Sequence, residues 1–355
     1  MSHKALVTGI TGQDGAYLAQ FLLGKGYEVT GAGHRTALAD LWRLRELGIW
    51  EHPRLKIEPF DVTDMGAAIH LLERTQPDEI YNLAGRSFVR LAYEQPHSTT
   101  EINAIGVLNL LEAIRIVAPR ARFYQASTSE MFGNVEEFPQ RENTPFLPRS
   151  PYGIAKLYAH LMTVSYRQQY GMFGACGILF NHESPLRGME FVTRKITDGV
   201  AKIRHGKLDC LELGNLNAMR DWGFAGDYVE GMWKMLQKDV PGSYVLSTNR
   251  CVSVRDFALM AFQNAGIDVR FQGEGPDEVA VEAGSRRIML RINKAFHRPA
   301  ENTPLVGDAA KARAELGWEP STSVEAVCAM MVEADLRRNQ DGNSRTKFLR
   351  VVSSA

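Results

Sequence analysis

The sequence predicts an α/β protein in which a doubly wound parallel sheet is followed by a smaller C-terminal lobe. Two observations indicate this fold class. Short apolar runs alternate with amphipathic segments through the first half of the chain, and such alternation implies right-handed crossovers between parallel strands. A glycine-rich turn also follows the first apolar run directly, as in sheets that bind dinucleotides at the carboxyl ends of their strands.

The individual elements follow from apolar periodicity. Buried strands are expected at Ala5–Val7, Glu28–Gly31, Leu55–Pro59, Glu79–Leu83, Arg122–Ala126 and Ala175–Phe180. Apolar residues at spacings of three and four predict helices at Tyr17–Leu23, Met65–Glu73, Ala104–Val117, Tyr152–Tyr170, Val192–Arg204 and Asp227–Leu236. Residues 273–287 are rich in glycine and charge, and we expect an exposed loop there.

We expect three parts along the chain. Residues 1–180 form the Rossmann-type cofactor domain with the catalytic candidates, and residues 181–337 supply mainly the substrate lobe, with interleaving of the two allowed. Residues 338–355 are polar and weakly patterned, which predicts a flexible tail.

Composition excludes several classes of function. Lys+Arg and Asp+Glu both total 41 in 355 residues, and this balance argues against a general binder of nucleic acid or anionic membranes. The four cysteines are scattered without paired metal-ligand spacing, so no metal is expected. No signal peptide precedes the first strand and no apolar run could span a bilayer, which predicts a soluble cytoplasmic protein.

The first turn is the cofactor candidate. Glycines at 9, 12 and 15 permit a tight turn, close approach of backbone to a pyrophosphate, and tight packing of helix on sheet. Helix N–H groups then favour the anion. The plainer interpretation is a structural glycine turn.

The end of the second strand discriminates between nicotinamide cofactors. An acidic residue about 20 positions after the glycine turn would bind a ribose hydroxyl and indicate NAD. Here His34 and Arg35 follow the strand, and no carboxylate comes before Asp40. Arg35 could pair with a 2′-phosphate, so NADP is favoured over NAD. The plainer interpretation is that Arg35 is a solvated loop arginine. Asp61, which ends the third strand, suits the adenine amine or, alternatively, a helix N-cap.

Tyr152 and Lys156 are the first catalytic candidates. Their Tyr-x-x-x-Lys spacing places both side chains on one face of a helix. A nearby ammonium favours the phenolate and lowers the tyrosine pKa, so that a weak base works near neutral pH. Thr128 and Glu130 follow an apolar strand directly, and the carboxylate would be a second proton-transfer group.

Together these motifs resemble the extended short-chain dehydrogenases/reductases, and longer strings resemble the GDP-mannose 4,6-dehydratase family. The resemblance covers roughly residues 3 to 335. The matching strings begin with Thr8–Gly15, Phe123–Glu130 and Arg149–Tyr152, and continue with Gly177–Pro185, Phe191–Ile196, Arg220–Gly223 and Arg298–Glu301.

The resemblance implies a role for each matching residue. The catalytic set would be Thr128, Glu130, Tyr152 and Lys156. NADP would be held by Gly9, Thr11, Gly12, Gln13, Asp14, Gly15, Arg35, Asp61, Val62, Leu83, Ala84, Gly85, Ser87, Tyr152, Lys156, His182 and Arg187. The nucleotide-sugar would be held by Ser87, Glu130, Asn181, Val192, Lys195, Arg220, Arg298 and Glu301, in which separated cations can neutralise a diphosphate. Homodimers or homotetramers are also implied.

The chain departs from the family pattern after the fourth strand. Arg90, Leu91 and Ala92 replace smaller or hydroxylic residues that would lie beside the sugar, and Ser98 stands where relatives have a tyrosine that borders the cofactor. The loop after Arg35 is altered as well. The hexose therefore stays open, with GDP-manno-heptose as one alternative to GDP-mannose.

The implied reaction is an internal redox dehydration. Tyr152 removes the proton of the 4-hydroxyl while hydride leaves carbon 4 for NADP, and Thr128 hydrogen-bonds the ketone. Glu130 then removes the proton on carbon 5, water leaves carbon 6, and hydride returns there. A 4-epimerase or 4-keto-sugar reductase would not need Glu130, and a non-catalytic NADP sensor would need neither acid nor base.

Overall fold

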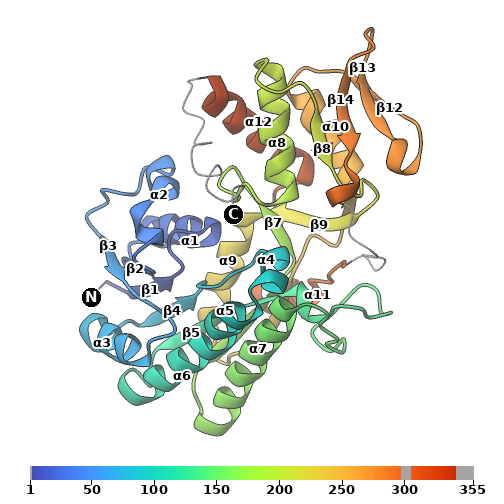
Figure 1. Cartoon of the computed structure of the whole chain (residues 1–355). Helices are drawn as coiled ribbons and strands as arrows, with labels where there is room; N and C mark the ends of the chain where they lie inside the picture. Colours follow the sequence, from blue (N-terminus) through green and yellow to red (C-terminus); the bar gives the residue numbers. More distant parts are fainter. Residues whose placement is uncertain (1, 297–304, 341–355) are drawn as a thin grey trace. The chain divides into compact units, whose positions relative to one another are not determined.

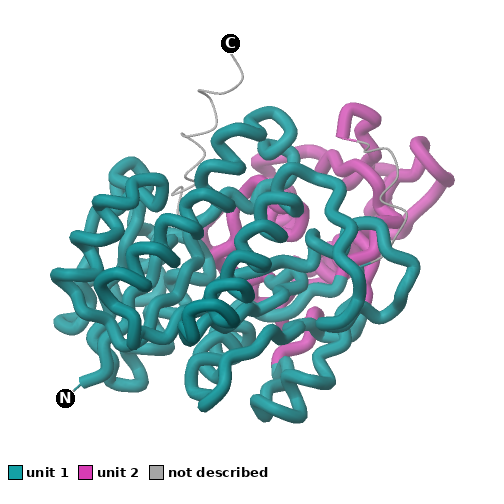
Figure 2. Tube along the Cα trace, turned by 90° about the horizontal axis from the view of Figure 1, so that it is seen from below, with its two compact units in different colours: residues 1–182, 221–250, 305–321 teal, residues 183–220, 251–304, 322–355 magenta. Residues whose placement is uncertain are grey.

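The computed structural model describes residues 2–296 and 305–340 (Figure 1). Two compact units are present, each built from several stretches of chain (Figure 2). Unit 1 comprises the described residues of 1–182, 221–250 and 305–321, and unit 2 comprises those of 183–220, 251–304 and 322–355. The stretches 221–250 and 305–321 belong to unit 1, and they lie in the part of the chain expected to supply mainly the substrate lobe, with interleaving allowed.

Unit 1 is built on a seven-stranded sheet in the order β10-β6-β5-β4-β1-β2-β3. Every neighbouring pair in it is parallel, which confirms the predicted fold class. Its strands are β1 (Lys4–Thr8), β2 (Glu28–Gly33), β3 (Leu55–Pro59), β4 (Glu79–Asn82), β5 (Arg122–Thr128), β6 (Gly174–Leu179) and β10 (Ser243–Leu246). All but β10 were predicted.

Helices cover both faces of this sheet. They are α1 (Gln13–Gly24), α2 (Trp42–Glu46), α3 (Met65–Thr75), α4 (Val89–Glu94), α5 (Pro96–Thr100), α6 (Gly106–Val117), α7 (Pro151–Tyr170), α9 (Ala225–Leu236) and α11 (Ala310–Leu316). Helices α3, α6 and α7 pack side by side, and α1 packs against α9 (Figure 1). Leu6, Ile80, Leu110 and Phe123 form part of the buried core beneath α3, α6 and α7.

Helix α7 carries two of the catalytic candidates, and its ends are well defined. The Ser150 hydroxyl accepts a hydrogen bond of 3.0 Å from the Gly153 N–H, and Pro151 occupies the first helical position, where its missing N–H costs nothing. Gly171, with φ of 66°, ends the helix in the left-handed conformation. These signals fix the register in which Tyr152 and Lys156 face the sheet.

Unit 2 combines three helices with a four-stranded sheet in the order β12-β13-β14-β8. The strands are β8 (Leu211–Leu213), β12 (Val269–Gln272), β13 (Val279–Glu282) and β14 (Ile288–Ile292), and the helices are α8 (Val192–Arg204), α10 (Val254–Asn264) and α12 (Val324–Gln340). A buried ion pair of 2.7 Å between Arg194 Nη2 and Asp335 Oδ1 joins α8 to α12. The chain passes between the units within β7 (Asn181–Glu183) and β9 (Met219–Phe224), and β11 (Cys251–Ser253) follows.

Two expectations for the second half need revision. Residues 273–287 are not simply an exposed loop, because β13 lies within them and pairs on both sides. Its residue Ala280 is fully buried, although charged neighbours in the sequence conceal the short apolar pattern. Residues 338–340 end helix α12, whereas 341–355 of the expected tail lie outside the described residues.

None of the helices in the described ranges has the length and apolar character that a bilayer-spanning segment needs.

Candidate active site

The glycine turn after β1 lies where backbone must approach backbone closely. Gly9 has φ of 71°, and a Cβ there would lie 2.6 Å from the carbonyl carbon and oxygen of Leu83. A Cβ on Gly15 would lie 2.3 Å from the Gly9 oxygen. The turn is therefore tight against the end of β4, with the first N–H groups of α1 beside it, and this cradle fits a diphosphate.

Asp14 and His182 are brought together although 168 residues separate them. The His182 Nε2 atom lies 2.8 Å from Asp14 Oδ2, and its Nδ1 atom lies 2.8 Å from the Phe180 oxygen. The ring stacks on Tyr228 with centroids 4.6 Å apart. Since a carbonyl and a carboxylate only accept, both contacts are hydrogen bonds when both ring nitrogens carry a proton.

The residues expected to read the adenosine end lie together at the ends of β2 and β3. His34 and Arg35 are exposed, and His34 Nε2 lies 3.7 Å from Asp61 Oδ2. Burial opposes ionisation of Asp61, but hydrogen bonds from the Thr63 N–H and hydroxyl outweigh it and lower the Asp61 pKa. Asp61 is not the N-cap of α3, because Asp64 takes that position by accepting from the Ala67 N–H.

Asn103, which lies in the turn directly before α6, holds the loop after β4. Sequence reasoning missed this residue. Asn103 Oδ1 accepts the Arg86 N–H at 2.9 Å, and its Nδ2 donates to the Arg86 oxygen at 3.0 Å. Asn103 lies in a π-helical turn, Glu101–Ile105, of a kind that often marks functional sites. A π-helical turn adds one residue to a helical turn, and the apolar spacing of the sequence does not reveal this addition. Leu83 and Ala84 are half-buried, whereas Gly85 and Ser87 are exposed.

Tyr152 and Lys156 both lie buried at the start of α7, with 7% and 5% exposure. The Lys156 ammonium donates a 3.0 Å hydrogen bond to the Ala126 oxygen of β5 and lies 6.0 Å from the centre of the Tyr152 ring. Burial lowers the Lys156 pKa to about 8, against the opposing charge of Asp14. The geometry agrees with an ammonium placed to influence the phenol.

Thr128 and Glu130 follow at the carboxyl end of β5. The Thr128 hydroxyl accepts the Glu130 N–H at 3.2 Å, and Glu130 sits half-buried in a single 3₁₀ turn, Ser129–Met131. This turn packs against α7, so all four catalytic candidates lie in one region of unit 1. A single 3₁₀ turn has little dipole, which weakens the alternative that Glu130 is only a helix-end acid.

The residues expected to hold the nucleotide-sugar are divided between the units. Ser87, Glu130 and Asn181 lie in unit 1, whereas Val192, Lys195 and Arg220 lie in unit 2. Val192 and Lys195 are in the first turn of α8, and burial lowers the Lys195 pKa, with Glu212 opposing. Arg298 and Glu301 lie outside the described residues.

Two further sets of contacts concern Arg187 and the altered loop after β4. Arg187 Nε lies 3.0 Å from Glu183 Oε2, and its guanidinium stacks 3.5 Å from the centre of the Phe191 ring. In the altered loop, Arg90 forms an exposed ion pair of 3.2 Å with Glu94 along α4, while Ala92 is buried. The substitution at position 92 therefore faces the interior of the fold.

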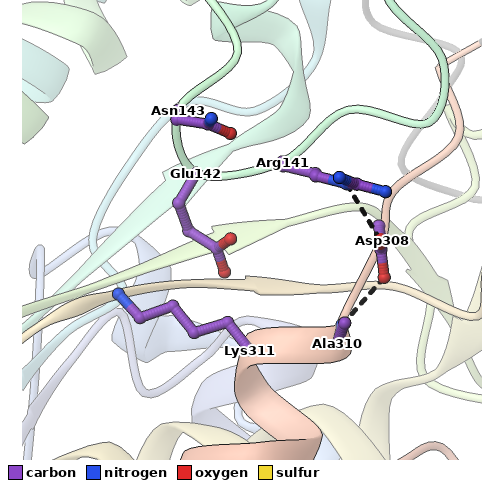
Figure 3. A pocket seen from close by; sticks show the side chains of 6 residues that line it. All are labelled: Arg141, Glu142, Asn143, Asp308, Ala310 and Lys311. Atoms are coloured by element: carbon purple, nitrogen blue, oxygen red, sulfur yellow. Dashed lines mark hydrogen bonds and ion pairs between the residues drawn. The ribbon is translucent and has the colours of Figure 1, made fainter.

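A separate open hollow of about 440 Å³ lies in unit 1 (Figure 3). Its lining residues are Arg141, Glu142, Asn143, Asp308, Ala310 and Lys311. The charges around it are engaged in structural contacts: Arg141 Nε lies 3.0 Å from Asp308 Oδ2, and Lys311 donates to the Ser243 oxygen of β10. None of the predicted site residues that the structure describes lines this hollow. Within residues 2–296 and 305–340, no cluster of His, Cys, Asp and Glu could hold a metal ion.

A known protein family matches the chain over most of its length. The model of the family described as GDP-mannose 4,6 dehydratase matches residues 6–331. The chain belongs to the GDP-mannose 4,6-dehydratase family.

Individual members of the GDP-mannose 4,6-dehydratase family resemble the chain over almost its whole length. The GDP-mannose 4,6-dehydratase of Yersinia enterocolitica is 48% identical over 350 residues, which is 94% of each chain. The GDP-mannose 4,6 dehydratase of Drosophila melanogaster is 46% identical and covers 94% of this chain and 86% of its own.

Solved structures share the fold at lower identity. A dTDP-glucose 4,6-dehydratase from Streptomyces venezuelae, with NAD and TYD bound, has a TM-score of 0.79 at 22% identity, covering 96% of this chain and 98% of its own. The structure of RMD from Pseudomonas aeruginosa, complexed with NADPH, has a TM-score of 0.75 at 20% identity, covering 95% and 100%. At these identities the likeness concerns the fold of this dehydratase-family chain.

Proposed function

We propose that the protein is an NADP-dependent GDP-sugar 4,6-dehydratase that converts GDP-mannose to its 4-keto-6-deoxy derivative. The observation that carries the proposal is the packing of the Thr128–Glu130 turn against the helix that bears Tyr152 and Lys156. An epimerase or a keto-sugar reductase needs only the Tyr–Lys pair. The membership in the GDP-mannose 4,6-dehydratase family favours dehydration over both, and over a non-catalytic NADP sensor.

The side chains divide the proton transfers among them. Tyr152 takes the proton of the 4-hydroxyl, since the Lys156 ammonium favours its phenolate. Thr128 donates a hydrogen bond to the oxygen that becomes the 4-ketone. Glu130 takes the proton from carbon 5, which the ketone has acidified, and returns it to the departing 6-hydroxyl, so that water leaves. A nicotinamide cofactor held by unit 1 would supply the hydride acceptor for carbon 4 and the hydride donor for carbon 6, and a proton from solvent would replace the one that carbon 5 has lost.

The cofactor proposal rests on unit 1. The cradle at Gly9 and Gly15 would be filled by any side chain, and it would receive the diphosphate, with Asp14 and His182 beside it. Arg35 and His34 at the end of β2 would contact a 2′-phosphate, and no acidic residue lies between Glu28 and Asp40. These features favour NADP over NAD, although relatives of the fold bind either NADPH or NAD. Of the residues proposed to hold the GDP-sugar, Val192, Lys195 and Arg220 belong to unit 2.

Isotope transfer tests the reaction. With GDP-mannose deuterated at carbon 4, we expect the label at carbon 6 of a 4-keto-6-deoxy product, with no loss to solvent. Label returned to carbon 4 would indicate an epimerase, and label in free reduced cofactor would indicate a simple dehydrogenase. The altered loop at residues 90–92 does not decide between GDP-mannose and GDP-manno-heptose. The same assay with GDP-manno-heptose makes that choice. If the heptose is turned over faster, the proposed substrate is GDP-manno-heptose instead of GDP-mannose.

We further propose a homodimer or homotetramer in the cytoplasm. Ile154, Tyr158 and Leu161 lie on one side of α7 and are 55%, 37% and 52% exposed. An apolar stripe of this kind suits association of copies. Sedimentation of the wild type and of Leu161→Lys would test this, with a smaller species expected for the variant.

A further inference from the structure

Three polar side chains form a buried row across the sheet of unit 1. Thr8, Asn82 and Gln125 are register partners on β1, β4 and β5, and each is 0% exposed. Central parallel strands normally carry apolar residues at such positions. A buried polar group destabilises the fold unless it is hydrogen-bonded, so the row must be fully paired or serve a purpose.

The row is a continuous hydrogen-bonded chain with one direction. The Thr8 hydroxyl accepts the Ala84 N–H at 3.1 Å and donates to Asn82 Oδ1 at 2.7 Å. Asn82 Nδ2 donates to Gln125 Oε1 at 2.8 Å, and Gln125 Nε2 donates to the Ala126 oxygen at 3.0 Å. Because an N–H only donates and a carbonyl only accepts, the two backbone ends fix the orientation of both amides.

The chain ends at the atom that holds the catalytic lysine. The Ala126 oxygen accepts a hydrogen bond from Gln125 and another from Lys156 Nζ, both at 3.0 Å. A carbonyl oxygen has two lone pairs, so these two donors use both. The pairing of β4 with β5 ends at Asn82 and Gln125, one residue before Ala126. On that side the two side chains, rather than a strand partner, hold this carbonyl.

We propose that Gln125 is a positioning residue for Lys156, which it orients through the shared Ala126 carbonyl. Held by Asn82 and Thr8, the Gln125 amide fixes that oxygen and thereby the ammonium at its distance from the Tyr152 ring. Without the amide, the buried ammonium keeps a less defined partner and stabilises the phenolate less well. The inference rests on the proposed function, in which Tyr152 is the base.

The test uses Gln125→Met, which keeps the length of the side chain and removes its hydrogen bonds. We expect kcat with GDP-mannose at neutral pH to fall about tenfold with little change in KM, and the acid limb of the pH profile of kcat to move about one unit upward. Gln140→Met is the matched control. Gln140 is also 0% exposed, and it bonds the Glu137 oxygen and the Val306 N–H, each at 2.8 Å; its loss should lower stability and leave the pH profile in place.

A second readout needs neither cofactor nor turnover. The near-ultraviolet absorbance of the Tyr152 phenolate, taken as the difference between each protein and its Tyr152→Phe partner, should titrate at higher pH in Gln125→Met than in the wild type. If Gln125→Met does not fold, Thr8→Val cuts the same chain at its other end, and a smaller shift in the same direction is expected.

The outcomes separate the two proposals. Lower kcat with an unmoved acid limb and an unmoved phenolate titration would make Gln125 a purely structural residue and overturn the inference. A wild-type protein that turns over no GDP-sugar would refute the proposed function, while the phenolate titration would still decide whether Gln125 controls the Tyr–Lys pair.

Discussion

The Ser127 Oγ atom lies 2.9 Å from the Nδ1 atom of His160, and both side chains are buried. Ser127 precedes Thr128 on β5, and His160 lies one turn beyond Lys156 on α7, so the contact ties the two catalytic elements together. The Phe146 ring packs edge-to-face with the imidazole, with centroids 5.4 Å apart. Burial lowers the His160 pKa to about 4, and the charge of Arg167 adds to this. The imidazole is therefore neutral at pH 7.

The lowered pKa of the buried His160 predicts that acid destabilises the fold. Between pH 6.5, the ordinary histidine value, and about 4, the unfolded chain binds a proton that the folded protein refuses, so stability falls on acidification through that window. The full effect is on the order of 3 kcal/mol at 1.36 kcal/mol per pKa unit. Urea unfolding at pH 7, 6 and 5 should show about 2 kcal/mol of this loss by pH 5 in the wild type, and a smaller loss in His160→Gln. An equal pH slope in both proteins would assign the acid sensitivity to other groups.

Lys156 predicts a conflict between stability and activity. Its pKa is about 8 in the folded protein, against 10.5 ordinarily, so the protonated form is disfavoured by folding. Between those values the unfolded chain holds more protons, and stability rises with pH. Lys156→Met should thus raise the free energy of unfolding at pH 7 by roughly 1–3 kcal/mol, and abolish turnover. Chemical denaturation of both proteins at pH 7 measures the difference; a less stable variant would contradict the expectation.

Glu130 predicts a selective loss of the elimination. In Glu130→Gln the carbon 5 proton has no acceptor, so we expect turnover to fall by about 10²- to 10⁴-fold. NADPH affinity should stay within twofold. Mass spectrometry of GDP-mannose recovered from heavy water provides the direct check, since exchange at carbon 5 should disappear in the variant. Persisting exchange would move the base to another residue.

The Asp14–His182 pair predicts coupled effects on cofactor affinity. His182→Phe leaves the Asp14 carboxylate without its 2.8 Å partner beside the expected diphosphate, and should weaken NADPH binding about tenfold, or 1.4 kcal/mol. In Asp14→Asn the added His182→Phe change should matter far less, because the two effects share one interaction. Isothermal titration of the four proteins completes the cycle; additive losses would show that the pair is not coupled to binding.

The sequence predicted best where local chemistry decides structure. The six apolar runs of the first half became strands, and five of them are largely buried, whereas β3 at the sheet edge is only partly buried. The apolar spacing in residues 152–170 also predicted α7 to within one residue. Strand β10 was missed because its place at the sheet edge depends on a long return of the chain. The roles of Asn103 and Gln125 could not be predicted either, since a buried amide acquires its partners only when distant strands and turns meet.

The late position of β10 in the sequence affects how the protein can fold during synthesis. This strand, from residues 243–246, pairs with β6 at the edge of the sheet, and α11 adds residues 310–316 to the same unit. During synthesis on the ribosome, β6 must therefore wait with an open edge until more than 60 further residues have emerged. A gene fragment that stops after residue 182 would encode a sheet that lacks its last strand, so we expect it to aggregate by adding strands from other copies at that edge.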